Sequence, residues 1–387
     1  MLDPIDPLLR AELIRYGDMA QACYDAFDLD HSCKFDRSQF FESIGRSKHG
    51  YHVESYIYSK YLIHSIWPND WSHKPNWIGY IAVSNDEYSA YLGRRDITIA
   101  WRGTVTDAEK IADLMFYQKS IRYYRIPSPD KKIRAEAGFL RMYAKKHENC
   151  KLCHHSAREQ VLAVVQRVKD QYADEEISIT ITGHSLGSAL AIINAYDIAE
   201  NGLNGCNVPI CVFSFSGPRV GNTRFKERLE ELGVKVLRVV NIHDKVPGVP
   251  GVFLNEKAPT IVQKVSEFFL PFCYLHVGEE LALDHKTSPF LKDIHNLSYF
   301  HNLEVHLHLL DGFQGKMNAF SPLQWRNFSF VNKSTDFLKE HLLVPPKWWN
   351  TKEYKKFIEN LKGPWMIDYQ QSCHENHSSE EDEHHQG

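Results

Sequence analysis

The sequence has no long apolar run and no excess of basic charge. None of its 387 residues lies in an uninterrupted stretch of 18 apolar residues, so we expect no transmembrane helix. The formal net charge is −4 at pH 7, whereas nucleic-acid-binding proteins usually carry a strong basic excess. We therefore expect no nucleic-acid partner.

The start of the chain lacks the features of a targeting segment. Residues 1–17 contain no apolar core of the secretory type. Asp3 and Asp6 are also unlike the acid-poor composition of a transit peptide. We expect a cytoplasmic protein, unless a targeting segment is missing from this sequence. The 8 cysteines are then expected to be free thiols rather than a disulfide framework.

The composition, with 43% hydrophobic and 24% charged residues, is typical of a globular protein that needs no disulfide or metal to fold. Short β-branched runs alternate with helical patterns, which favours an α/β fold with a mostly parallel sheet covered on both faces. The expected strands are 78–84, 96–101, 177–183, 210–217 and 234–242, and the expected helices are 8–28, 157–171, 185–200, 300–312 and 334–342.

We expect one α/β domain over residues 1–372, with a helical and irregular N-terminal extension of about 1–75. Residues 373–387 are polar and acidic and cannot bury a core, so they are expected to be a disordered tail.

The strongest functional motif is GHSLG at 183–187, which lies between an expected strand and an expected helix. This is the context of a nucleophile elbow, a turn so tight that glycines are needed on both sides of the serine. Ser185 is therefore the candidate nucleophile. The amide of Leu186, at the start of the helix, is a candidate donor to an oxyanion.

A serine nucleophile needs a base and an acid that orients the base. In enzymes with this elbow the acid and then the histidine follow the serine along the chain. Asp244, which follows the strand ending near residue 242, is the preferred acid, and Asp284 is the alternative. The spacing favours His301 as the base and leaves other candidates open, which are His276, His285, His295, His306 and His308.

Two other patterns suggest metal or haem chemistry but do not fit it. His301, Glu304, His306 and His308 do not have the spacing of a helical zinc motif. The CKLCHH segment at 150–155 contains the spacing of covalent haem attachment, yet no export signal accompanies it. We expect a polar loop with two free thiols there, and neither a metal nor a cofactor in the protein.

Several longer stretches carry a family resemblance. These are LDPIDPLLRAELIRYGDMAQACYDAFD, GRRDITIAWRGTVT, ITGHSLGSALAIINAYDIAE, FSGPRVGNTRFKERLEELGVKVLRVVNIHDKVPG, DHKTSPFLK, HNLEVHLHLLDGF and VNKSTDFLKEHLLVPP. They resemble the class-3 lipases, and specifically the plant class I phospholipase A1 proteins of the gamma group. The resemblance implies an α/β-hydrolase fold over nearly the whole chain.

The resemblance also implies roles for individual residues. Ser185, Asp244 and His301 match the family's serine, acid and base. Thr104, after the Arg102-Gly103 pair, matches a residue whose amide completes the oxyanion hole.

Residues 106–116 match the family's lid, and their apolar side chains Ile111, Leu114 and Met115 cluster on one helical face. Such a helix would cover an apolar cleft in water and open at a lipid surface. A surface helix packed on the core by the same face explains the pattern equally well.

Two residues depart from the family pattern, Ser188 where Gly or Ala is frequent and His306 where an apolar residue is expected. We expect neither to displace the proposed chemistry.

The function that follows is hydrolysis of the sn-1 acyl ester of phospholipids, with galactolipids and triacylglycerols as further substrates. The partner would be a membrane or lipid-droplet surface, and the oligomeric state is left open. The family also implies the chloroplast as location if a transit peptide is missing. The alternatives are a catalytically inactive lipase-like binding or signalling protein and a serine esterase acting on other esters.

Overall fold

The structure of the chain is a computed structural model, and it describes residues 2–29, 35–44, 50–60, 76–104, 117–203, 208–251, 255, 273–316, 318–322 and 326–350. A seven-stranded sheet lies at its centre, in the order β1-β2-β3-β6-β7-β8-β9. The strands are β1 Tyr51–Ser59, β2 Asn76–Ser84, β3 Arg95–Trp101, β6 Ile177–His184, β7 Ile210–Phe215, β8 Lys235–Asn241 and β9 Glu279–Leu283. A small second sheet pairs β4 Gln118–Ser120 with β5 Arg134–Glu136.

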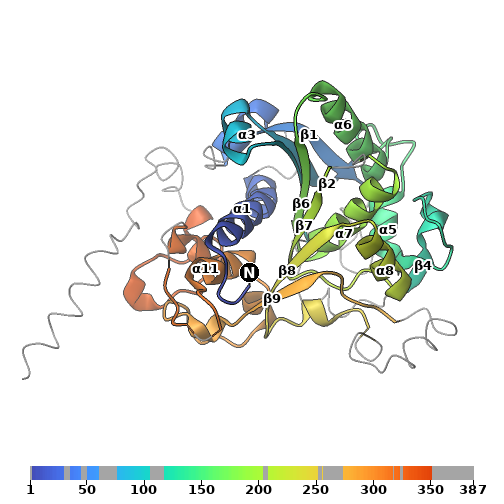
Figure 1. Cartoon of the computed structure of the whole chain (residues 1–387). Helices are drawn as coiled ribbons and strands as arrows, with labels where there is room; N and C mark the ends of the chain where they lie inside the picture. Colours follow the sequence, from blue (N-terminus) through green and yellow to red (C-terminus); the bar gives the residue numbers. More distant parts are fainter. Residues whose placement is uncertain are drawn as a thin grey trace, which may run out of the picture.

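Helices cover both faces of the large sheet. The α-helices are α1 Pro7–Leu29, α2 Phe40–Ser43, α3 Asp86–Leu92, α5 Ala137–Ala144, α6 Ala157–Gln171, α7 Leu186–Glu200, α8 Thr223–Glu231, α10 Leu297–Phe300 and α11 Leu303–Gly312. Short 3₁₀ turns are η1 Arg37–Gln39, η3 Ile121–Tyr124, η4 Val246–Gly248, η5 His285–Thr287, η6 Phe328–Asn332, η7 Glu340–Leu342 and η8 Trp348–Asn350. Figure 1 shows α1 and α11 on one face of the sheet, with α5, α7 and α8 on the other.

The sheet is antiparallel over β1, β2 and β3, and parallel from β3 through β6, β7 and β8 to β9. In the parallel part the carboxyl ends of the strands meet at one edge, where α/β proteins bind their ligands. The register places Trp101 beside Gly183 and Gly183 beside Ser214. The residues that follow β3, β6 and β8 therefore gather at this edge.

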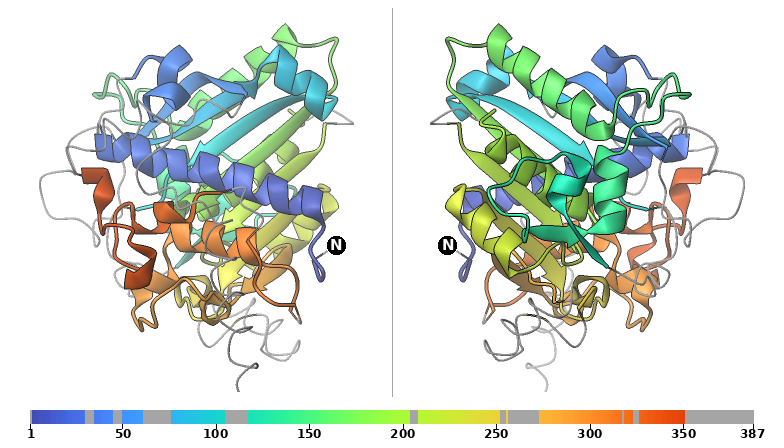
Figure 2. Two further views of the ribbon diagram at one scale, coloured as in Figure 1. Left: turned by 90° about the vertical axis from the view of Figure 1, so that its left-hand side faces the viewer. Right: turned by 90° about the vertical axis from the view of Figure 1, so that its right-hand side faces the viewer.

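Each face of the sheet has its own apolar core. On one side Ile181, Leu190 and Val212 belong to a buried cluster with α7, and every residue of α7 from Leu186 to Ala199 is buried. On the other side α1 crosses the sheet and packs against α11 (Figure 2). The two helices approach closely at Gly17, where an added Cβ would lie 2.2 Å from Leu307 Cδ2.

The expected strands and most of the expected helices are present, but the C-terminal part differs from expectation. The expected helix 334–342 is wrong, because only the turn Glu340–Leu342 is helical there. Asn332 Oδ1 instead accepts hydrogen bonds from the amides of Phe337 and Leu338, at 2.8 and 2.9 Å. These bonds use amides that a helix would need, and they let Leu338 bridge to Leu291.

The expected helix 300–312 is two helices, α10 and α11, with His301 and Asn302 between them. A new helix, α11, starts after Asn302, because the Asn302 side chain accepts a hydrogen bond from the Val305 amide and caps the helix. His301 is therefore held at the junction of two helices rather than within one.

The N-terminal segment expected as an extension contributes α1 and β1, which pack on the sheet and pair with β2. The acidic tail 373–387 lies outside the described residues. No helix among the described residues has both the length and the apolarity to cross a membrane.

Candidate active site

Ser185 occupies a strained turn between β6 and α7. Its backbone has φ 59° and ψ −128°, in the positive-φ region that non-glycine residues avoid. The turn is held by hydrogen bonds from the Ser185 amide to Phe215 O, at 2.9 Å, and from the Ser188 amide to Ser185 O, at 3.0 Å. Strain of about 1–3 kcal/mol at such a residue is typical of functional turns.

The two glycines of the motif permit this turn. A Cβ on Gly183 would lie 2.4 Å from the carbonyl carbon of Gly187, and a Cβ on Gly187 would lie 2.3 Å from Trp101 O. Both obstacles are backbone atoms, which cannot move aside as a flexible side chain can. The turn therefore requires glycine at both positions.

His301 and Asp244 are brought together at the same edge. The distance from His301 Nδ1 to Asp244 Oδ2 is 2.6 Å, and the Asp244 side chain is fully buried. Asp244 Oδ1 also accepts a hydrogen bond from the Val246 amide, at 2.9 Å. This arrangement keeps a proton on His301 Nδ1 and leaves the lone pair on Nε2.

The electrostatics of Asp244 favour its charged form. Burial, the largest single cause, raises the pKa of this carboxyl, but the charge and hydrogen bond of His301, the charge of His306 and the Val246 amide together lower it by more. The net pKa of Asp244 lies below its ordinary value. Asp244 is thus an ionised, buried partner able to orient the imidazole and to stabilise its protonated form.

Ser185 Oγ and His301 Nε2 are both buried, and neither has a hydrogen-bond partner among the described residues. Buried polar atoms are normally paired, so two unpaired atoms at one edge of the sheet are unusual. A hydroxyl and a basic nitrogen in this state can form a bond to each other or to a bound ester.

Tyr24 and His184 connect α1, the serine turn and His301. The Tyr24 hydroxyl lies 2.7 Å from His184 Nδ1, and His184 Nε2 lies 2.8 Å from the carbonyl oxygen of His301. Burial, followed by the charges of His301 and His306, holds the pKa of His184 well below its usual range. The ring is therefore neutral, with Nε2 donating to the carbonyl and Nδ1 accepting from Tyr24.

Sequence reasoning gave no role to Tyr24 or to the His184 ring. His184 stands inside the GHSLG motif and could have been considered. Nothing in the sequence links it to Tyr24, which lies 160 positions away.

The loop after β3 reaches the serine through Gly103. Arg102 Nε donates to Trp77 O at 3.0 Å, and the guanidinium carbon lies 3.8 Å from the centre of the Phe27 ring. A Cβ on Gly103 would lie 2.2 Å from the Tyr24 hydroxyl and 3.2 Å from Ser185 Cβ. The loop therefore passes directly beside the candidate nucleophile.

The two residues expected to donate to an oxyanion flank this contact. Thr104 follows Gly103, and its hydroxyl is buried with no hydrogen-bond partner among the described residues. Leu186 is the first residue of α7 and is buried, so its amide lies at the positive end of a helix of 15 residues.

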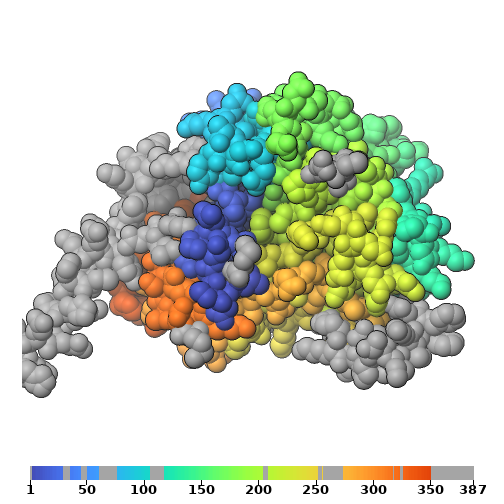
Figure 3. Space-filling view, in the orientation of Figure 1, coloured from blue at the N-terminus to red at the C-terminus, as the bar shows by residue number. Residues whose placement is uncertain are grey.

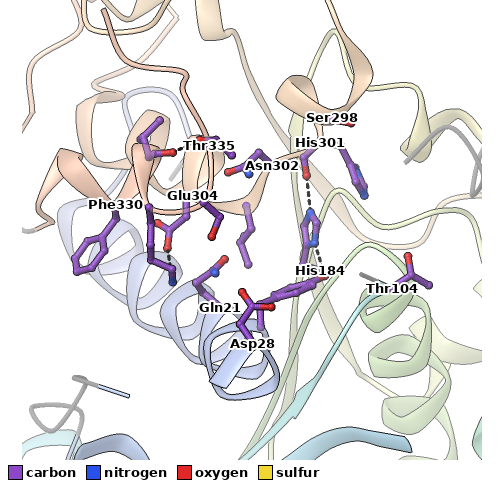
Figure 4. Close-up of a pocket in the computed structure, with 15 residues that line it drawn as sticks. Gln21, Asp28, Thr104, His184, Ser298, His301, Asn302, Glu304, Phe330 and Thr335 are labelled. Atoms are coloured by element: carbon purple, nitrogen blue, oxygen red, sulfur yellow. Dashed lines mark hydrogen bonds and ion pairs between the residues drawn. The ribbon is translucent and has the colours of Figure 1, made fainter. Parts of the chain in front are cut away.

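A pocket of about 320 Å³ opens beside His301 and Thr104. Figure 4 shows Gln21 and Asp28 of α1 on one side of it, and Asn302 and Glu304 on another. Most of its lining residues are polar by type, but apolar atoms make up somewhat more of its surface than polar atoms do. Its remaining members are Tyr24, His184, Ser298, Leu303, Phe330, Val331, Lys333, Ser334 and Thr335.

A buried charge network forms one wall of this pocket. Lys333 contacts Asp25 and Glu304, and Arg326 pairs with Glu304 and with Asp18. These contacts fix α1 and α11 to the residues on either side of η6. In Figure 3 the surfaces of α1 and of the orange C-terminal part adjoin.

The other candidate bases lie elsewhere. His306 bonds to Ser216 Oγ and Asn302 O, His308 to Ser288 Oγ, and His276 to Pro247 O. Burial lowers the pKa of His306 to about 4 and that of His308 to about 3, so both are neutral core residues.

Three other sequence predictions concern the alternative acid, the two cysteines at 150 and 153, and the lid. Asp284 lies 3.1 Å from His243 Nε2 and makes no bond to His301. Cys150 and Cys153 are free and buried in a loop, as expected of two thiols. The lid residues Ile111, Leu114 and Met115 lie outside the described residues.

A mostly parallel sheet with a serine on a strained strand-to-helix turn is the framework of the α/β-hydrolases. Residues 98–254 match the family described as Lipase (class 3). The chain is 50% identical over 406 residues to Phospholipase A1-Igamma2, chloroplastic, of Arabidopsis thaliana, a match that covers 100% of this chain and 76% of the relative. The chain belongs to the class 3 lipase family, among the plant class I phospholipase A1 proteins.

Two further similarities are more distant. The chain is 41% identical over 332 residues to Galactolipase DONGLE, chloroplastic, of Arabidopsis thaliana, covering 80% of this chain and 67% of the relative. Among solved structures it is similar to the lipase from Rhizopus microsporus var. chinensis, with a TM-score of 0.49 and 22% identity, covering 74% of this chain and 78% of that one.

Proposed function

We propose that the chain is a lipid acylhydrolase that cleaves the sn-1 acyl ester of phospholipids through an acyl-enzyme on Ser185. The observations that carry the proposal are the strained turn of Ser185, the His301–Asp244 pair bonded at 2.6 Å, and the packing of the His184 ring, next to Ser185 in the chain, on the His301 ring with centroids 4.6 Å apart. Membership of the lipase family supports the same chemistry.

In the first half-reaction His301 Nε2 takes the Ser185 proton as the hydroxyl oxygen attacks the acyl carbonyl carbon. Asp244 stabilises the imidazolium that forms, and the amides of Thr104 and Leu186 donate to the oxyanion. His301 then returns the proton to the glycerol oxygen as the ester bond breaks. Lysophospholipid leaves, and the acyl group stays on Ser185.

In the second half-reaction water attacks the acyl-enzyme. His301 accepts a proton from the water and passes it to Ser185 Oγ as the fatty acid is released. The same groups therefore serve both halves, and the chain's own side chains supply every proton transfer.

We propose that the pocket beside His301 receives the head group. Gln21, Asn302 and Thr335 in its lining offer hydrogen-bond partners to hydroxyls and phosphate, and the Asp28 carboxylate can attract a cationic head group. Galactolipids are proposed as further substrates, supported by the similarity to a protein named galactolipase.

We propose the chloroplast as the location, because the relative of 50% identity is named chloroplastic. The enzyme would act at a membrane surface as a peripheral protein. Residues 106–116 are proposed as its lid.

The test uses phosphatidylcholine with different acyl chains at sn-1 and sn-2, with galactolipid and triacylglycerol vesicles alongside. Release of the sn-1 chain by the wild type, and its loss in Ser185→Ala, supports the proposal. Release of the sn-2 chain would reject the stated regiochemistry. A folded protein that releases nothing would favour the lipase-like binding protein or an esterase for other esters.

A further inference from the structure

A second cluster of titratable side chains lies next to Asp244 in the chain. His243 follows β8, and Asp284 and His285 follow β9. The two strands are neighbours with Asn241 beside Leu283 in the register, and the Ile242 amide bonds to Leu283 O at 2.9 Å. The parallel pairing therefore fixes these three residues together.

Asp284 Oδ1 lies between the two imidazoles. It is 3.1 Å from His243 Nε2 and 3.8 Å from His285 Nδ1. All three potential ligand atoms lie within 4.8 Å of one another. A tetrahedral zinc site, with bonds of about 2.0–2.1 Å, separates its ligand atoms by about 3.3–3.4 Å. The two distances bracket that value, so small movements would complete the site.

His285 is the feature that packing does not explain. Its side chain is 2% exposed, and both ring nitrogens are buried with no hydrogen-bond partner among the described residues. The ring packs against Tyr299 and Phe300, with centroids at 5.3 and 4.9 Å. A phenylalanine would pack as well without burying two unpaired polar atoms, which is unfavourable.

The simplest account without an ion covers only part of the cluster. Asp284 Oδ1 accepts from the Lys286 amide at 3.0 Å and so caps η5, besides facing His243. These bonds explain Asp284 and His243, but they leave His285 unpartnered. An ion beside Asp284 would occupy Nδ1 of His285, the ring nitrogen that lies 3.8 Å from Asp284 Oδ1.

We propose that His243, Asp284 and His285 bind a divalent transition-metal ion of the zinc type. A set of two imidazoles and one carboxylate suits such ions better than it suits calcium or magnesium. Water would fill the fourth position, because the side chains of His243 and Asp284 are 30% and 33% exposed.

The metal site would adjoin the acyl-transfer site without sharing a residue with it. His243 directly precedes Asp244, so an ion held there would tie the loop that carries Asp244 to the end of β9. The binding itself does not rest on the proposed function, and Ser185→Ala should bind the ion as the wild type does.

The experiment measures Zn²⁺ binding to the full chain at neutral pH by competition with a chromophoric chelator, and Co²⁺ binding by visible absorption. His285→Phe keeps an aromatic ring and removes both nitrogens. His243→Gln, at a partly exposed residue, is the second variant and serves if the first one folds poorly. Each should weaken binding by at least about tenfold and abolish the rise in Tm that Zn²⁺ gives the wild type.

Two matched controls address the other histidines. His295→Gln changes a histidine whose side chain is 66% exposed and lies outside the cluster. A second control replaces the tail residues His374, His377, His384 and His385. Both should retain the site. Binding that survives His243→Gln and His285→Phe, or that disappears with the tail histidines alone, would overturn the proposal, as would absence of binding by the wild type.

Discussion

Removal of the Tyr24 hydroxyl should reduce the rate of ester hydrolysis although Tyr24 makes no hydrogen bond to Ser185 Oγ or His301 Nε2. Tyr24 donates to His184 Nδ1 at 2.7 Å, and His184 in turn donates to His301 O at 2.8 Å. Burial raises the pKa of Tyr24 well above its ordinary value, so the hydroxyl stays protonated and acts as a donor. In Tyr24→Phe the buried Nδ1 loses its partner, and the His184 ring is free to turn.

The expected size of the effect follows from these contacts. An unsatisfied buried nitrogen costs about 1–3 kcal/mol of stability. Since His184 holds the backbone of His301, a small shift of the imidazole is expected too. Misplacement of a catalytic group by about 1 Å can reduce a rate by as much as about 10²-fold. We expect kcat to fall by about tenfold or more, with KM changed little.

The assay compares kcat and KM for a soluble ester with the free energy of unfolding in urea. Tyr274→Phe is the matched control, because Tyr274 is 1% exposed and its hydroxyl has no hydrogen-bond partner among the described residues. That variant should be close to neutral in both measurements. If Tyr24→Phe loses stability as expected but keeps the wild-type kcat, then His184 does not position His301, and the reasoning fails.

Three further predictions concern the acid, a buried carboxyl and the serine turn. Asp244→Asn should reduce kcat by roughly 10⁴-fold without unfolding the chain, because an amide favours the wrong tautomer of the histidine; a small loss measured with a soluble ester would remove Asp244 from its role. Burial raises the pKa of Glu136 from 4.5 to about 7, so the folded chain holds a proton that the unfolded chain releases. Stability should therefore fall as the pH rises from about 5 to about 7, by at most roughly 3 kcal/mol. Glu136→Gln should flatten this part of the urea-unfolding profile, and an unchanged slope would contradict the raised pKa. Gly183→Ala places a Cβ 2.4 Å from backbone and should abolish activity and lower Tm, whereas Gly248→Ala meets nothing within 4 Å and should leave both measurements unchanged.

The parallel core of the fold could be predicted because its strands and helices are local in sequence. β6 and α7 follow directly from ISITITG and from the apolar helix after it, and the α6 bounds agree with the expected 157–171. By contrast β9, with the sequence EELAL, is too short and acidic to be recognised without its neighbour β8. The helix expected at 334–342 is wrong for a related reason. The hydrogen bonds that hold this segment out of a helix go to the side chain of Asn332, outside the segment itself.

Motifs were enough to name the residues of the candidate site, but the contacts between those residues could not be predicted from the sequence. The pairing of His301 with Asp244 spans 57 positions, and spacing alone left six histidines open. The structure separates them by their partners, since His306 and His308 bond to Ser216 and Ser288 instead. The Tyr24–His184 connection depends on how α1 crosses the sheet, which no local pattern encodes.

The measurement that tests the central claim most directly is covalent labelling by a fluorophosphonate, followed by mass spectrometry of the digested protein. The account predicts one adduct on Ser185, formed rapidly by the wild type, slowly by Asp244→Asn and not at all by Ser185→Ala. Hydrolysis of phosphatidylcholine should be lost in proportion to the labelling. An adduct on another residue, or full hydrolysis by the labelled protein, would contradict Ser185 as the nucleophile.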